Sequence, residues 1–151
     1  MQASRFVPVD PERAFDALLV APLPGIFDRR YLALPPIREV RGPDGVWGTV
    51  GQTRTISTTD GGRLLETLTT VDRPHRFGYV LTDVHGPMRP LVRRVEGVWS
   101  VSPENGGSRI GWAWTLYPTV APARLLMPVL ARMWRGYAHL ALERVEQILV
   151  A

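Results

Sequence analysis

The chain has 151 residues, 45% of them apolar and 21% charged, which predicts one compact domain over residues 1–151 and excludes a disordered chain, a fibre or a membrane span. The net charge is +4, but all 18 basic residues are arginines scattered along the chain, which argues against a nucleic-acid-binding surface. Cysteine is absent, which excludes disulfides and thiolate chemistry, and the N-terminus lacks a secretory apolar core, so we expect a cytoplasmic protein.

The N-terminal region begins with a predicted strand over residues 3–9, and a helix follows it. Asp10 is a suitable N-cap and Pro11 suits the first helical position, while apolar residues at helical spacing continue the helix over 11–20. Prolines then end this helix. A second short helical turn is expected within residues 26–34.

The central region changes to short segments that are rich in Thr, Val, Trp and Tyr and separated by turn residues, a pattern typical of strands. Most gaps are too short for a crossover helix, so neighbouring strands must pair antiparallel. The predicted strands cover residues 37–41, 50–58, 63–72, 76–83, 92–102 and 108–117.

The C-terminal region returns to apolar residues at helical spacing. These residues are Leu126, Leu130, Met133, Tyr137, Ala141, Val145 and Ile148. They predict a long amphipathic helix within residues 122–150. We expect the helix to begin near Pro128, because a proline ends or kinks any earlier turn.

This order of elements predicts an α+β fold in which a seven-stranded, curved antiparallel sheet wraps around the long C-terminal helix, with two short helices after the first strand. A twisted sheet beside a single long helix buries its apolar face only by curling around that helix. Alternation along each strand then decides which side chains point inward. The inward set is Phe77, Tyr79, Leu81, Val95, Gly97, Trp99, Val101, Ile110, Trp112, Trp114 and Leu116.

Many of these inward side chains are aromatic, and they form the candidate ligand-binding set. Buried indole and phenol groups need hydrogen-bond partners, which a strand-lined interior supplies mainly where a cavity admits water or a ligand. Each of these residues alone is explained by packing in the hydrophobic core. Together they are typical of a pocket for a flat apolar molecule. The candidates are Tyr79, Trp99, Trp112, Trp114, Met133, Trp134 and Tyr137, with His85 at the pocket mouth.

Four segments carry a resemblance to a known family: VDPERAFDAL, GQTRT, LLETLTTVDRPHRFGYV and EGVWSVSPENGGSRIGWAWTLYP. In them the chain resembles the SRPBCC superfamily, most closely its polyketide cyclase/dehydrase and lipid-transport branch. The resemblance implies the helix-grip fold of the START lipid-transfer domains and the birch pollen allergen. It implies roles that range from aromatase/cyclase to carrier, but no catalytic residue can be matched position by position. The loop DVHGPMRPL (83–91) and Pro128 depart from the family pattern and would shape the pocket mouth.

Glu66 and Arg54 are the candidate catalytic residues. Glu66 lies between Leu64 and Leu68, so its carboxylate shares their apolar face. Arg54 lies across the DGG turn, and an even pairing register puts it on the same face. A buried carboxylate could then remove a proton next to a carbonyl while the guanidinium stabilises the oxyanion. The alternative is a structural ion pair or two solvated residues.

The three histidines form no metal-binding constellation, and no dinucleotide, P-loop or GxSxG motif occurs, so neither a metal nor a cofactor is expected. His75 falls in a turn and His139 on the polar stripe of the last helix. We therefore expect both to be exposed to solvent.

Three functions stay open at this point. The first is binding of a small hydrophobic molecule, aromatic, polycyclic or acyl, and the second is polyketide cyclisation or dehydration by Glu66 and Arg54 in the same pocket. The third is docking on an anionic membrane or an acidic partner through the C-terminal region. The docking residues would be Arg124, Arg132 and Arg135 with Met127, Met133 and Trp134. A monomer or homodimer is expected in each case.

Overall fold

The computed structural model describes residues 1–151 and confirms seven strands and a long C-terminal helix. The strands are β1 (Gln2–Val7), β2 (Ile37–Arg41), β3 (Thr53–Thr58), β4 (Arg63–Asp72), β5 (Arg76–His85), β6 (Val92–Glu104) and β7 (Gly107–Pro118). The helices are α1 (Pro11–Val20), α2 (Leu23–Ile26), the 3-10 helix η1 (Ala121–Leu126) and α3 (Met127–Val150).

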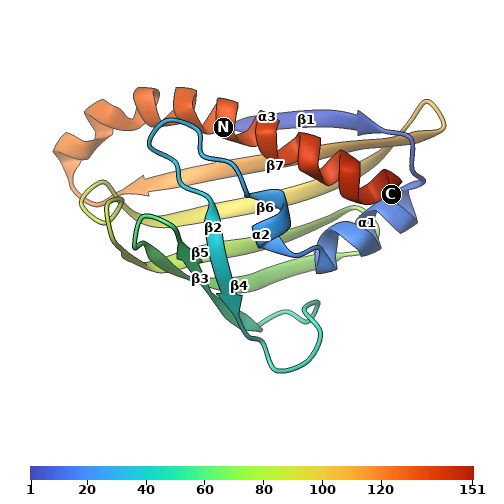
Figure 1. The fold of residues 1–151 in the computed structure, drawn as a ribbon, viewed down its shortest axis with the longest axis horizontal. Helices are drawn as coiled ribbons and strands as arrows, with labels where there is room; N and C mark the ends of the chain where they lie inside the picture. The colour runs from blue at the N-terminus through green and yellow to red at the C-terminus, as the bar shows by residue number, and fades with distance from the viewer.

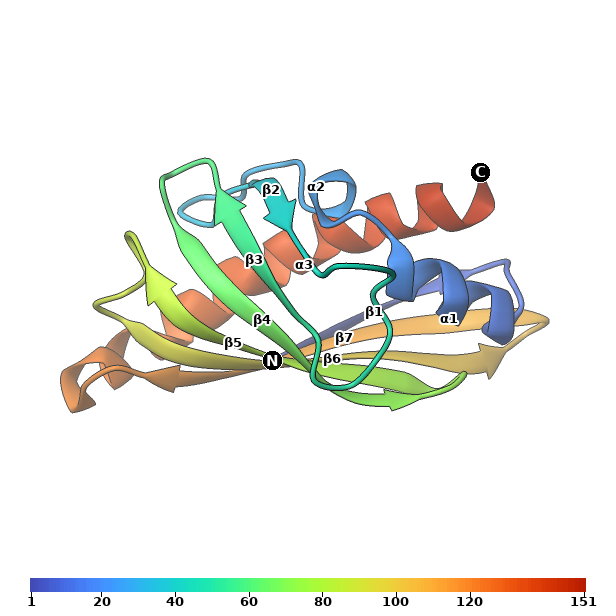
Figure 2. The ribbon, with the colours of Figure 1, turned by 90° about the horizontal axis from the view of Figure 1, so that it is seen from below.

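The strands form one antiparallel sheet in the order β1-β7-β6-β5-β4-β3-β2, so the chain runs as a meander from β2 to β7 and β1 adds to the far edge. The sheet curves strongly, and α3 lies along its concave face (Figures 1 and 2). Helix α1 contacts β6, β7 and α3, while α2 contacts β2 and α3. The core therefore sits between the sheet and the three helices, as the order of elements predicts.

Several boundaries differ from the sequence prediction: β1 ends at Val7 and not at residue 9, β5 to β7 are slightly longer, and two further differences have clear local reasons. Strand β3 begins at Thr53 and not at residue 50, because Gln52 Oε1 accepts hydrogen bonds from the backbone N–H groups of Gly48 and Thr49, at 2.8 Å each, and holds them in a turn. The expectation of a helical turn within residues 26–34 is wrong. The turn is α2, which ends at Ile26 and carries a proline in its first turn, where a missing N–H costs no hydrogen bond.

Helix α3 buries one stripe of side chains against the sheet, and its phase differs slightly from the predicted one. The buried residues are Leu130, Trp134, Tyr137, Ala138, Ala141, Leu142, Val145 and Leu149. Met133 is only half-buried and Ile148 is exposed, because Trp134 and Leu149 take the inward positions. Pro128 lies in the first turn, so the helix begins close to the predicted place. None of the helices combines the length and the hydrophobicity that a membrane span requires.

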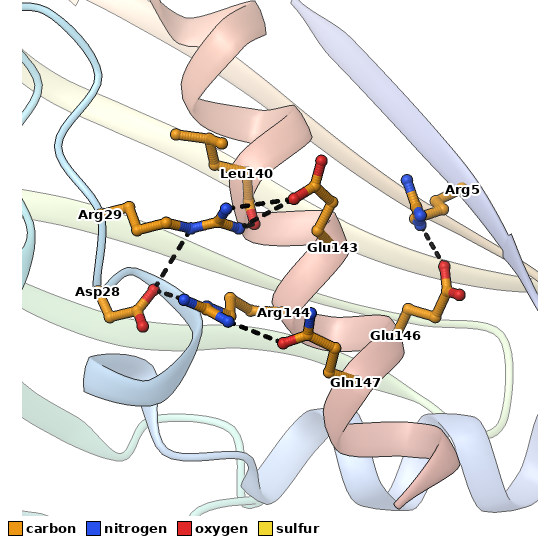
Figure 3. Close-up of polar contacts among 8 residues, drawn as sticks. All are labelled: Arg5, Asp28, Arg29, Leu140, Glu143, Arg144, Glu146 and Gln147. Atoms are coloured by element: carbon orange, nitrogen blue, oxygen red, sulfur yellow. Dashed lines mark hydrogen bonds and ion pairs between the residues drawn. The ribbon is translucent and has the colours of Figure 1, made fainter.

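The outer side of α3 is tied to the segment that follows α2 (Figure 3). Arg29 Nη2 donates to the backbone oxygen of Leu140 at 2.7 Å and to Glu143 at 3.2 Å, and Arg144 Nε donates to Asp28 Oδ1 at 3.0 Å. On the inner side, the Tyr137 hydroxyl donates to Pro35 O at 2.8 Å. These contacts hold residues 27–36 against α3, where they close one side of the interior.

Candidate functional site

A cavity of about 130 Å³ lies between the concave face of the sheet and the helices. Of the 31 residues that line it, 22 are hydrophobic, so the cavity favours an apolar occupant. Strands β2 to β7 and the helices α1, α2 and α3 all contribute side chains. An apolar cavity of roughly 150 Å³ holds a benzene molecule, so this volume suits a compound of about one ring.

Three tryptophans of β6 and β7 form an aromatic wall of the cavity. Trp99 and Trp112 are direct partners across the two strands, and their rings stack with centroids 5.0 Å apart and planes 10° apart. Trp114 lies two residues further along β7 and meets Trp112 edge-on at 5.3 Å. Phe27 packs against Trp112 at 5.1 Å and Tyr137 at 5.5 Å. Both indoles of β7 therefore point inward, as the strand alternation predicts.

The side chain of Tyr79, on β5, extends over β6 toward the tryptophans of β7. Its register partner on β6 is Gly97, and the partner of Gly97 on β7 is Trp114. A Cβ at Gly97 would stand 2.1 Å from Tyr79 Cζ, so only glycine leaves room for the ring to pass over β6. The hydroxyl then accepts hydrogen bonds from Trp112 Nε1 at 2.8 Å and Trp114 Nε1 at 2.9 Å. Burial raises the pKa of the Tyr79 phenol, and the Glu66 carboxylate raises it further.

Arg54 and Glu66 form a buried ion pair that lines the cavity from β3 and β4. They are register partners on β3 and β4, which confirms the predicted shared face, and Arg54 Nε donates to Glu66 Oε1 at 2.5 Å. Their side chains are only 10% and 5% exposed. The Arg54 guanidinium also lies 4.0 Å from the ring centroid of Trp47. Burial raises the pKa of Glu66, and Arg54 lowers it again in part.

The ion pair keeps polar atoms available to an occupant. Both residues line the cavity. Glu66 Oε2 and the Nη groups of Arg54 make no hydrogen bond within the protein, and each of these atoms keeps some solvent-accessible surface. The carboxylate oxygen is therefore available as an acceptor or a base, and the guanidinium as a donor.

Polar and more exposed residues line the end of the cavity formed by the β3–β4 turn and the β5–β6 loop. Asp60 Oδ1 accepts hydrogen bonds from Thr58 Oγ1 at 2.6 Å and Gly62 N at 2.9 Å, which orders the turn. His85 lines this end and contacts Asp83 Oδ1 at 3.1 Å through Nε2. No group of three or more His, Cys, Asp or Glu side chains is placed to hold a metal ion.

Eight of the ten predicted site residues line the cavity, and two do not. The lining residues are Glu66, Arg54, Tyr79, Trp99, Trp112, Trp114, Tyr137 and His85. Trp134 instead packs against Trp112 and Trp114 at centroid distances of 4.9 and 6.0 Å, and Met133 is half-buried against the core. His75 and His139 are exposed, as predicted.

The structure changes the composition of the predicted docking surface. Arg124, Arg132 and Arg135 are exposed, but Trp134 is only 2% exposed and faces the core, so it cannot contact a partner. The large apolar side chains exposed in this region are Val120, Leu125, Leu126 and Val129, which lie on η1 and beside it.

Sequence reasoning missed several residues of the site. Phe27, Leu34 and Pro35 line the cavity from a segment without regular periodicity, so no pattern marked them. Trp47 stacks on Arg54 from a loop of the same kind. Gly97 had a usable signal, because a glycine at an inward strand position often marks the close approach of another group.

Comparisons with known proteins agree on the fold. The family model described as polyketide cyclase/dehydrase and lipid transport matches residues 1–149. Among solved structures, a protein of Thermus thermophilus has a TM-score of 0.71 at 19% identity, covering 99% of this chain and 96% of that one. Ara h 8.0201 gives 0.66 at 18% identity, with coverage of 99% and 96%. The ginseng major latex-like protein 151 from Panax ginseng gives 0.72 at 11% identity, with 97% and 94%. A search of curated protein sequences gives no match.

Proposed function

The chain belongs to the polyketide cyclase/dehydrase and lipid transport family of the SRPBCC superfamily, and we propose that it binds a small, flat, hydrophobic molecule between its sheet and α3. The observation that supports this most is the apolar cavity with an aromatic wall made by Trp99, Trp112 and Trp114. Stacked rings bury flat surface well, and the few polar groups of the cavity can orient a bound molecule. Its volume favours a single aromatic ring or a short acyl chain over a polycyclic compound.

Titration of flat apolar compounds against the intrinsic tryptophan fluorescence tests this proposal. Three of the five tryptophans line the cavity, so binding changes their emission. Val95→Phe fills the cavity from β6 and is expected to abolish the response. Val98→Phe is the matched control, because Val98 is 40% exposed on the outer face of the same strand.

Two outcomes would contradict the proposal. One is the absence of a response to any compound in the panel. The other is unchanged affinity in Val95→Phe, with a melting temperature that shows a folded variant. Equal loss of binding in both variants would indicate global damage, and X-ray analysis of wild-type crystals soaked with the panel compounds would then decide whether any of them occupies the cavity.

Catalysis by Glu66 is the second candidate function, and the accessible Oε2 of a buried carboxylate with a raised pKa favours it. Ionised Glu66 would take a proton from the carbon next to a substrate carbonyl, and the C–H electron pair would form an enolate. The Arg54 guanidinium would stabilise the enolate oxygen. The enolate carbon would then attack a second carbonyl of the same substrate, which closes a ring and forms an alkoxide that takes the proton back from Glu66. Loss of this hydroxyl group together with a proton from the neighbouring carbon, as one molecule of water, would complete the dehydration.

The Glu66→Gln variant tests the catalytic role. It keeps the size of the side chain and removes the base, so cyclisation of a 1,5-diketone probe such as heptane-2,6-dione should fall to the uncatalysed rate while its affinity changes only a few-fold. Equal turnover by the variant and the wild type would remove Glu66 from the mechanism. Such a result would leave the binding function intact.

A further inference from the structure

The hydrogen-bonding capacity of the Tyr79 hydroxyl is only partly used by the protein. A phenol oxygen has two lone pairs and one hydrogen, whereas an indole N–H can only donate. The two contacts to Tyr79 Oη, from Trp112 Nε1 at 2.8 Å and Trp114 Nε1 at 2.9 Å, therefore occupy both lone pairs. The hydroxyl can then only donate.

No protein acceptor takes this remaining hydrogen. The two indole contacts are the only hydrogen bonds of Tyr79 Oη, although the residue is buried. A buried donor without a partner is costly, so an oxygen of a bound molecule or of water must lie in front of it. Tyr79, Trp112 and Trp114 all line the cavity, which places that oxygen inside it.

The phenol also stays protonated. Burial and the charge of Glu66 both raise the pKa of Tyr79, so the hydroxyl remains a donor over the whole range in which the protein would work. Gly97 maintains the geometry, because the tyrosine ring occupies the space that any larger side chain at this position would fill.

We propose that the cavity selects ligands that carry a hydrogen-bond acceptor oxygen, such as a ketone or ester carbonyl, and that Tyr79 holds this oxygen by donating its hydroxyl hydrogen. The inference rests on the proposed binding function and names its ligand class. Glu66 lies on β4, next to Tyr79 on β5, and Arg54 lies on β3, so the ion pair and the Tyr79 hydroxyl face the same cavity.

A pair of probes with the same shape tests the selection. Acetophenone carries a carbonyl where α-methylstyrene carries a C=CH2 group, so the two differ in the acceptor and hardly in volume. Water solvates the ketone better than the alkene, so the two affinities differ for reasons outside the protein. We therefore take the ratio of the dissociation constant of acetophenone to that of α-methylstyrene, and compare this ratio between wild type and Tyr79→Phe. We expect Tyr79→Phe to shift this ratio against acetophenone by about five- to tenfold, with α-methylstyrene nearly unchanged.

The carbonyl stretching frequency of acetophenone bound to wild type and to Tyr79→Phe supplies a second readout. We expect the infrared band of the wild-type complex at lower wavenumber than in a hydrocarbon solvent, as for a hydrogen-bonded ketone, and the band of the Tyr79→Phe complex closer to the hydrocarbon position. A bound band at the hydrocarbon position, or a ratio that Tyr79→Phe leaves unchanged while both probes bind, would overturn the role of Tyr79 alone. If neither these probes nor the wider panel binds, the proposed binding function fails and this inference fails with it.

Discussion

Tyr79 and Gly97 are register partners on β5 and β6, and the tyrosine ring occupies the space where a side chain at position 97 would be. A Cβ there would stand 2.1 Å from Tyr79 Cζ, far inside contact distance. This one glycine therefore allows a hydroxyl from β5 to reach two indoles on β7. The cavity wall depends on it.

Gly97→Ala is expected to lower the free energy of unfolding by about 2–3 kcal/mol, because the ring must move and its two indole contacts are lost. Urea denaturation measures the change. Gly78→Ala is the control, since Gly78 lies in β5 next to Tyr79 and a Cβ added there would meet its nearest neighbour at an ordinary 3.5 Å. Equal losses in the two variants would show that the close approach at position 97 is unimportant.

Removal of one partner of the buried ion pair is expected to be costly. Arg54→Met leaves the Glu66 carboxylate buried without its cation, which typically costs about 3–5 kcal/mol of unfolding free energy. The double variant Arg54→Met/Glu66→Leu removes both charges and should recover most of this loss. Chemical denaturation of the two variants checks the prediction. If the double variant is as unstable as the single one, the loss of unfolding free energy comes from the missing ion-pair contacts and not from the unpaired charge of Glu66.

The pH dependence of stability has a definite sign for Glu66. Its pKa in the folded protein is raised above the ordinary 4.5, so the folded state binds this proton more tightly than the unfolded state. The contribution of Glu66 to stability is therefore fully present below pH 4.5 and is lost as the pH rises through the raised pKa. In Arg54→Met the partial lowering by arginine disappears, so the loss should extend to higher pH.

Denaturation of wild type and Glu66→Gln across this pH range measures the effect. Above pH 4.5 we expect the unfolding free energy of the wild type to fall relative to that of Glu66→Gln, because only the wild type has a carboxyl group at this position that loses its proton. Glu39 and Glu104 do not obscure it, because their arginine partners lower their pKa values and their own losses occur on the acid side of 4.5. A difference that is constant with pH would mean that the pKa of Glu66 is not perturbed.

Tyr137→Phe tests how the wall segment after α2 is held. The variant removes the hydroxyl that donates to Pro35 O, which leaves a carbonyl without its partner at a cost of about 1–3 kcal/mol. Hydrogen exchange at the Ile37 amide, which bonds to Phe27 O, should accelerate. Tyr31→Phe is the control, because Tyr31 lies on the same segment and its hydroxyl has no hydrogen bond to the protein. Similar exchange in both variants would show that the Tyr137 contact does not hold the segment.

The sequence by itself determined the sheet and much of the site. Strand alternation and short turns are local properties, so they place Trp112 and Trp114 on one inner face and bring Arg54 opposite Glu66 across a hairpin. The amphipathic spacing of the last helix likewise predicts that the sheet must curl around it.

Only the tertiary structure decided the contacts that depend on the rotation of α3 and on strands that are not neighbours. Neighbouring residues on a helix point about 100° apart, so a small change of phase places Trp134 inward and leaves Met133 half-buried. Tyr79 on β5 contacts Trp112 and Trp114 on β7 across the intervening strand β6. Strand alternation describes one strand at a time, so it cannot predict a contact between strands that are not neighbours. Residues 27–36 lack periodicity, and their place in the wall follows from their contacts with α3.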